Sequence, residues 1–200
     1  MCDSGAALAV MGNHEFNAIA FATELDGLYL REHSTKNIKQ HREFLKEFNE
    51  NTKEYRDAID WFRTLPLYLE LDGLRVVHAC WDQSLIDRLK NEHSGSVLTE
   101  TLLISASDKM CWEYEAIETL LKGKEIPLPA GQGFLDKDDN PRHEIRIKWW
   151  DASITTYTQA FLGPKKAITH IPDDPINADH LIEYSESEVP VFIGHYWLEG

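Results

Sequence analysis

Three short aliphatic runs in this chain end in the same way, each leading into a histidine that stands beside a glycine, an alanine or an asparagine. The runs and the residues that follow them are 8–11 before Gly12-Asn13-His14-Glu15, 74–77 before His78-Ala79, and 191–193 before Gly194-His195. Runs of this length are typical of buried β-strands. If each strand delivers an imidazole at its carboxyl end, the histidines meet at one edge of a sheet, where open α/β sheets bind their ligands.

The residue types at these three places favour a metal site. Imidazole nitrogen and amide oxygen suit mid-row divalent metals such as Mn, Fe or Zn better than Mg or Ca. A single histidine after a strand, however, is more often a hydrogen-bonded core residue. Residues 166–170 also read as a strand-like run that ends in a histidine, His170, so the pattern arises easily. Spacing alone leaves a metal site and a set of core histidines as open alternatives.

The motifs themselves, in their order along the chain, resemble a known family. The motifs are Gly12-Asn13-His14-Glu15, Val76-Val77-His78-Ala79 and Gly194-His195-Tyr196. They resemble the last three motifs of the calcineurin-like metallophosphoesterases, which include protein Ser/Thr phosphatases and diadenosine tetraphosphatases. The family pattern is D-x-H, G-D-x-x-D-R-G, G-N-H-[ED], a later histidine after a strand, and G-H. The resemblance spans essentially the whole chain and implies an α/β fold, a layered two-sheet sandwich flanked by helices.

The resemblance also implies a role for each motif residue. Asn13, through its side-chain oxygen, and the imidazoles of His78 and His195 resemble the ligands of the family's second metal. His14 resembles the histidine that contacts the substrate and protonates the leaving-group oxygen. Many members of the wider superfamily end in G-H-x-H, but this chain has Trp197 at the last position. The protein-phosphatase-like arrangement, which lacks that ligand, therefore fits better.

The activity implied by the resemblance is the hydrolysis of phosphate esters by two divalent metals, either Mn, Fe or Zn. Two cations about 3.5–4 Å apart bind the phosphoryl oxygens and activate the attacking water. His14 has to be cationic to act as the acid, and Glu15 or an upstream aspartate is expected to keep it so. The substrate implied is a phosphorylated small molecule, a phosphoprotein or a dinucleoside polyphosphate.

Two family motifs are missing from this sequence. It contains no D-x-H triplet and no G-D-x-x-D, so the ligands of the first metal and the bridging aspartate are absent. We therefore expect a partial phosphoesterase domain over residues 1–200, truncated at both ends. The full-length parent is expected to be active, whereas this chain alone is expected to bind at most one metal weakly and to be inactive. The alternative is a non-catalytic remnant or interaction module that retains half of the metal site.

Periodicity predicts the other elements. The pattern is helical over 37–65 with a break at Asn51-Thr52, and Asp72-Gly73 is a strong hairpin signal between two alternating segments. A helix is expected to begin at Ser84, a long surface loop to cover 126–141, and a strand to cover 144–149. Residues 27–66 and 84–188 are expected to form a cap and loops that select the substrate.

Charge and composition exclude several classes. The chain has 20 Lys and Arg against 34 Asp and Glu, a net charge of −14, which argues against a nucleic-acid or membrane-surface partner. No apolar run is long enough for a membrane span, and three cysteines without C-x-x-C spacing predict no disulfide framework. We expect a cytoplasmic protein.

A small basic cluster consists of Arg142, Arg146 and Lys148. Arg146 is a candidate for contact with a substrate phosphate. The alternative is that these residues form a solvated strand face.

Overall fold

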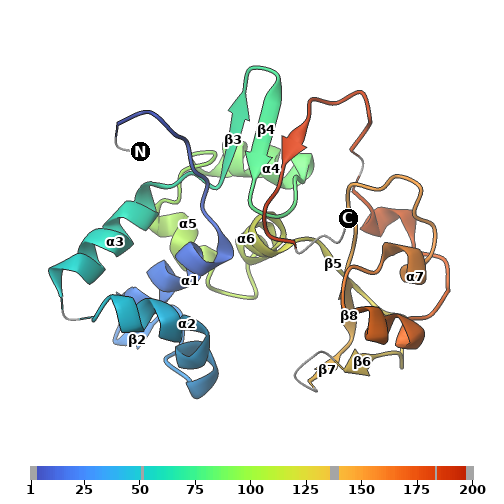
Figure 1. Ribbon diagram of the computed structural model, residues 1–200, viewed down its shortest axis with the longest axis horizontal. Helices are drawn as coiled ribbons and strands as arrows, with labels where there is room; N and C mark the ends of the chain where they lie inside the picture. Colours follow the sequence, from blue (N-terminus) through green and yellow to red (C-terminus); the bar gives the residue numbers. More distant parts are fainter. Residues whose placement is uncertain (1–3, 51, 136–139, 183, 197–200) are drawn as a thin grey trace. The chain divides into compact units, whose positions relative to one another are not determined.

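The computed structural model describes residues 4–50, 52–135, 140–182 and 184–196, which form a mixed α/β protein (Figure 1). The chain divides into two compact units, one made of Met1–Lys122 and Pro190–Gly200 and the other of Gly123–Val189. The predicted cap segment 27–66 belongs to the first unit. The predicted insertion 84–188 is divided between the two units after Lys122.

Four of the described helices of the first unit begin directly after a residue whose side chain caps them. The helices of this unit are α1 (Asn13–Ala22), α2 (Thr35–Glu47), α3 (Lys53–Thr64), α4 (Gln83–Glu92), α5 (Glu100–Ser105) and α6 (Trp112–Lys122). Ser34, Thr52, Asp82 and Thr99 each accept a hydrogen bond from a backbone N–H three residues on, at the starts of α2 to α5. The predicted break between two helices near residue 52 is confirmed, while Asn51 lies outside the described residues. Asp82, not Ser84, caps α4.

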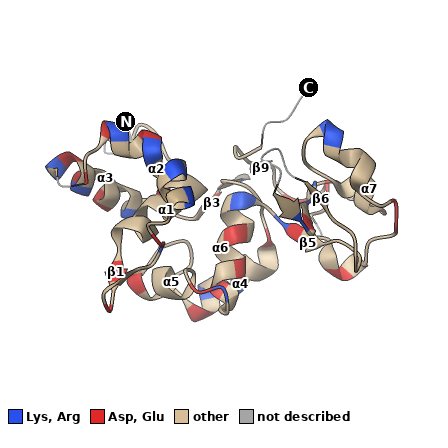
Figure 2. Cartoon of the chain, turned by 90° about the horizontal axis from the view of Figure 1, so that it is seen from below, with Lys and Arg blue, Asp and Glu red and all other residues tan. Residues whose placement is uncertain are grey.

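Helix α1 lies in the core of the first unit. Phe16, Ile19 and Phe21 are buried, and the helix packs against α3 and α6. Charged residues of both signs lie along α3 (Figure 2), whereas Glu15 is the single Asp, Glu, Lys or Arg within α1. A helix that is apolar on most sides is stable only when it is enclosed. The position of its amino-terminal residues is therefore set by core packing.

The three-stranded sheet of the first unit has the order β3-β4-β9. Strands β3 (Tyr68–Leu71) and β4 (Leu74–Val77) are antiparallel, and the predicted hairpin at Asp72-Gly73 is confirmed. Gly73 has φ of 75°, which suits glycine in a tight hairpin. Strand β9 (Val191–Phe192) runs parallel to β4. Parallel pairing brings the carboxyl ends of β4 and β9 to the same edge of the sheet.

The prediction of a strand over 8–11 is wrong. Residues 7–12 have no regular secondary structure, and Leu8 is 67% exposed. Met11 N–H donates to Pro66 O at 2.8 Å, and Met11 is fully buried. A strand requires a ladder of such bonds along a neighbouring strand. Within the described residues this segment borders no strand, so its aliphatic side chains led to the wrong assignment.

The second unit is built from short strands and turns. Strand β5 (Glu125–Pro127) pairs with β8 (Glu144–Arg146), and β6 (Phe134–Leu135) pairs with β7 (Pro141–Arg142). The predicted loop over 126–141 is therefore wrong where these strands lie; residues 136–139 are outside the described residues. The remaining elements are α7 (Tyr157–Ala160), η1 (Lys165–His170) and η2 (Ala178–His180). The run that ends at His170 is thus a 3₁₀ helix, and the strand predicted over 144–149 ends at Arg146.

Within the part of the chain that the structure describes, no helix combines the length and the apolar composition needed to cross a membrane.

A buried histidine joins α1 to α2. His41 lies against the rings of Phe21 and Phe44, at centroid distances of 4.9 Å each, and its Nε2 has no hydrogen-bond partner among the described residues. Burial, together with smaller contributions from the charges of Arg31, His14 and His33, lowers the pKa of His41 to about 4. The ring is therefore neutral in the folded protein at neutral pH.

The stability of the first unit should fall as the pH drops from 7 to 5. The pKa of His41 is near 6.5 when unfolded and about 4 when folded, so the unfolded state takes up the proton first. The neutral ring of His41 makes its full contribution to the free energy of unfolding above pH 6.5. This contribution is lost as the pH falls toward 4, and roughly 1–2 kcal/mol of it is gone at pH 5.

Urea unfolding of the wild type and of His41→Phe at pH 7 and pH 5 measures this effect. The phenylalanine ring keeps the aromatic contacts, so His41→Phe should lose less stability on acidification than the wild type. The matched control is His170→Phe, which removes an exposed histidine at the end of η1 and should keep the wild-type loss. An equal loss in the wild type and His41→Phe would show that other groups cause the acid sensitivity.

Candidate metal centre

The first side chain of the candidate site is placed by the start of α1. Gly12 is the N-cap, and its N–H donates to Glu15 Oε2 at 3.0 Å, while Phe16 N–H donates to Gly12 O at 3.1 Å. The Glu15 cap and this first helical backbone bond fix the first turn of the helix. Asn13 and His14 are therefore held as the first two helical residues, on a helix that the core encloses.

The two other side chains are placed by the sheet. His78 directly follows β4, and His195 lies three residues after Phe192, the last residue of β9. The backbone N–H groups of Gly194 and His195 both donate to His78 O, at 3.1 and 2.9 Å. These bonds continue the contact between the two strands past their ends. They set His195 beside His78 across 117 residues of sequence.

The side chains of Asn13, His78 and His195 converge. His78 Nε2 lies 3.1 Å from Asn13 Oδ1 and 3.1 Å from His195 Nδ1. The two imidazole rings meet edge to face, with centroids 5.1 Å apart and an interplanar angle of 68°. All three residues are partly buried. The structure therefore brings together the side chains of three separate motifs.

The spacing of these atoms fits a bound divalent cation. Two ligands at about 2.0–2.1 Å from a zinc-sized ion are themselves about 3–3.4 Å apart in octahedral or tetrahedral geometry. A neutral imidazole has one N–H and one lone pair, so His78 Nε2 makes at most one linear hydrogen bond with its two neighbours. A cation between the three atoms would accept one lone pair from each of them. Two imidazoles and one amide oxygen are a donor set that mid-row metals accept.

The protonation state of His78 suits a ligand. Burial lowers the pKa of His78; nearby Glu15 opposes this shift, and His14 adds to it. The neutral ring, which has a lone pair to donate, is therefore favoured in the folded protein. A metal ligand requires this form of histidine.

His14 lies outside the converging set. It is exposed at the start of α1, directly after Asn13, and no hydrogen bond to it is found among the described residues. Glu15, which was expected to hold it, uses Oε2 to cap the helix instead. The imidazole of His14 is thus accessible to a ligand in solution.

Gly12 is a site residue that the motif pattern contains but that we did not assign. A Cβ at this position would lie 2.6 Å from Glu15 Oε2 and 3.0 Å from His78 Cε1. The first distance is shorter than real Cβ contacts and the second is tighter than most of them, so glycine allows the His78 ring to approach the start of α1 without displacing a neighbour. The signal was present in the sequence, as the glycine directly before Asn13.

Other residues named from the sequence lie elsewhere. Arg146 is on β8 in the second unit, where its Nη2 donates to Glu125 Oε1 at 2.9 Å. Trp197 lies outside the described residues. Among those that are described, no three His, Cys, Asp or Glu side chains form a group that could hold a metal. The candidate centre therefore consists of two histidines and one amide, without a carboxylate ligand.

Comparisons with protein-family models, with curated proteins and with solved structures each gave no significant match. The resemblance to metallophosphoesterases rests on the three motifs themselves.

Replacement of Gly12 by alanine should weaken metal binding without unfolding the protein. The new Cβ displaces either Glu15 or the His78 ring, so affinity for Zn²⁺ should fall about tenfold or more, the size seen when groups that orient ligands are changed. Calorimetric titration with Zn²⁺ measures the affinity, and a thermal melt checks the fold.

Gly194→Ala is the matched control for this prediction. Gly194 is next to His195, but a Cβ there would meet no atom within 4 Å. Its affinity for Zn²⁺ should equal that of the wild type. If both substitutions weaken Zn²⁺ binding equally, or if neither weakens it, the placement of Gly12 against His78 is contradicted.

Proposed function

We propose that this chain carries half of the dinuclear metal centre of a metal-dependent phosphate ester hydrolase. The observation that supports the proposal most strongly is that His78 Nε2 lies 3.1 Å from both Asn13 Oδ1 and His195 Nδ1. Three motifs from distant parts of the chain meet there with a donor set suited to one cation. The order of these motifs matches that of the metallophosphoesterases.

Each residue has a role in this proposal. Asn13, His78 and His195 hold the cation, which when bound would neutralise phosphoryl charge and lower the pKa of water. His14, exposed beside Asn13, meets the substrate and donates a proton from its ring to the leaving-group oxygen. The substrate is a phosphorylated small molecule, a phosphoprotein or a dinucleoside polyphosphate.

The cation that this half-site takes is a late, nitrogen-preferring one such as Zn²⁺ or Ni²⁺. Two neutral imidazoles and an amide supply no negative charge to balance a dication, and Glu15 Oε2 caps α1. Hard cations depend on such charge more than late transition metals do. We therefore expect one weakly bound metal in these 200 residues.

The parallel β4–β9 pair is proposed to belong to a layered two-sheet sandwich, the finer architecture that the family resemblance implies.

The second candidate is a non-catalytic interaction module that retains the half-site. The lack of a carboxylate ligand among Asn13, His78 and His195 favours it, because a single cation cannot both bind the phosphoryl group and activate its attacking water. The two candidates differ when the missing ligands are supplied. Only the hydrolase gains activity.

The 200-residue chain should hydrolyse p-nitrophenyl phosphate at the background rate, even with added Mn²⁺. When a segment that bears D-x-H and G-D-x-x-D-R-G is supplied on the same polypeptide or by co-expression, activity should rise well above background. His14→Ala in that active form should lower the turnover number by about 10²–10⁴-fold, the usual contribution of a proton donor, with metal content unchanged.

His170→Ala is the matched control, since His170 ends a 3₁₀ helix in the second unit and should leave turnover unchanged. His78→Ala should instead lose metal and activity together. Robust turnover by the unsupplemented chain, or full turnover by His14→Ala, would contradict the roles proposed for these histidines. Failure of the completed form to turn over any phosphate ester would favour the interaction module.

A further inference from the structure

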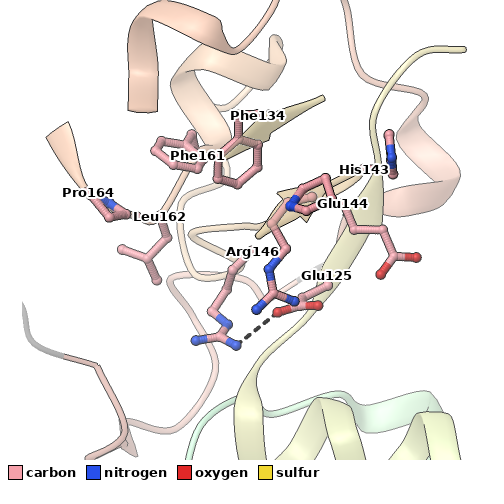
Figure 3. Close-up of a pocket in the computed structure, with 11 residues that line it drawn as sticks. Glu125, Phe134, His143, Glu144, Arg146, Phe161, Leu162 and Pro164 are labelled. Carbon is pink, nitrogen blue, oxygen red and sulfur yellow. Dashed lines mark hydrogen bonds and ion pairs between the residues drawn. The ribbon is translucent and has the colours of Figure 1, made fainter. Parts of the chain in front are cut away.

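The second unit contains a cavity of about 520 Å³ that the candidate metal centre does not use (Figure 3). It lies between the β5–β8 pair, the β6–β7 pair and residues 161–164. Its size is in the range of small-molecule and cofactor sites, about 300–1,000 Å³. Every lining residue belongs to the second unit, so the cavity is described within that unit alone.

One wall of this cavity is apolar and aromatic. Phe134 and Phe161 meet edge to face, with ring centroids 5.6 Å apart and an interplanar angle of 84°. Leu162 and Pro164 continue the wall, as Figure 3 shows. Phe161 is buried, with 6% of its surface exposed, whereas Phe134 is partly exposed and offers the apolar surface on which a planar ring packs. The wall therefore favours a ligand with a flat ring.

The opposite wall is charged and held by the strands. Glu125 and Arg146 are cross-strand partners, and Arg146 Nη2 donates to Glu125 Oε1 at 2.9 Å. Arg142 and Glu144 are exposed at the same cavity. A guanidinium matches the oxygens of a phosphate or carboxylate in a two-pronged contact. Glutamates beside it accept hydrogen bonds from hydroxyl or amino groups.

The histidine on this wall has a defined orientation. His143 Nδ1 lies 3.1 Å from Gln132 O, and because a carbonyl oxygen only accepts, Nδ1 is the donor. Leu128 N–H donates to His143 O at 2.8 Å, which fixes the backbone there. The charged wall is thus built on paired strands, and it carries the carboxylates of Glu125 and Glu144 as well as two arginines, so it is not a uniformly basic patch.

We propose that this cavity binds a nucleotide of the size of a nucleoside monophosphate. The flat base packs on Phe134, which the buried Phe161 supports, and the phosphate is bound by Arg142 and Arg146. Ribose hydroxyl or base amino groups donate to the carboxylates of Glu125 and Glu144. Because the chain has a net charge of −14, general electrostatic attraction does not account for binding of an anion. The inference goes beyond the proposed hydrolysis and requires no metal.

Titration with AMP in the presence of EDTA tests this inference, because the chelator removes the metal centre from the measurement. Saturable binding by calorimetry with a dissociation constant below about 1 mM is expected, with one site. Adenosine and inorganic phosphate each engage one wall, so each should bind at least about tenfold more weakly than AMP. No saturable AMP binding up to about 5 mM would overturn the proposal. Phosphate binding as tight as that of AMP would also overturn it, since the aromatic wall would then have no role.

Variants assign the binding to the cavity. Arg142→Gln and Arg146→Gln should each weaken AMP binding by about tenfold, since each removes charge-assisted hydrogen bonds. Phe161→Leu should weaken AMP and adenosine but leave phosphate unchanged. The matched control is Arg42→Gln, which removes an exposed arginine of α2 with the same change in net charge.

Arg146→Gln could disturb the β5–β8 pair, and thermal melts identify a variant whose fold is disturbed. Arg142 is exposed, so Arg142→Gln tests the site without disturbing that pair. AMP binding that survives Arg142→Gln at wild-type strength, or that falls equally in Arg42→Gln, would show that the cavity is not the nucleotide site.

Discussion

The candidate centre depends on the parallel pairing of β4 with β9. Arg75 and Val76 pair with Val191 and Phe192, and beyond the strands the N–H groups of Gly194 and His195 donate to His78 O. This short ladder closes a loop of more than a hundred residues and sets two imidazoles at one sheet edge. Closing so long a loop is entropically unfavourable, and the cost must be offset by packing elsewhere in the first unit. A break in this pairing would separate His195 from His78.

The third ligand reaches the same point by a different route. Asn13 is carried by α1, whose apolar faces pack into the core of the first unit, and Gly12 leaves room for the His78 ring. Glu15 Oε2 accepts a hydrogen bond from Gly12 N–H, so this carboxylate oxygen close to Asn13 caps the helix. The consequence is a site with good geometry and no formal negative charge. Such a site selects a nitrogen-preferring metal and depends on further ligands for phosphate chemistry.

Part of this structure could be predicted from the sequence, because local signals specify it. The Asp72-Gly73 turn and the Thr52 cap depend on a few adjacent residues, and the motifs indicated that Asn13, His78 and His195 belong together. The segment over 8–11 was misassigned because hydrophobic composition does not reveal whether a strand has a partner. Strand β8 was predicted within 144–149, whereas β5, β6 and β7 were missed because strands of two or three residues carry too little periodicity. The roles of Gly12 and Glu15 depend on distances that only the folded chain defines.

X-ray absorption spectroscopy of the Zn²⁺ complex of this chain tests the proposed metal centre most directly, because it reports the atoms bound to the metal. We predict a first shell of nitrogen and oxygen at about 2.0–2.1 Å, with the outer-shell scattering of two imidazoles. In His195→Ala one imidazole should be lost from that signal. A shell that contains sulfur at about 2.3 Å, or an imidazole count that is unchanged in His195→Ala, would show that Zn²⁺ binds elsewhere and would contradict the proposed centre.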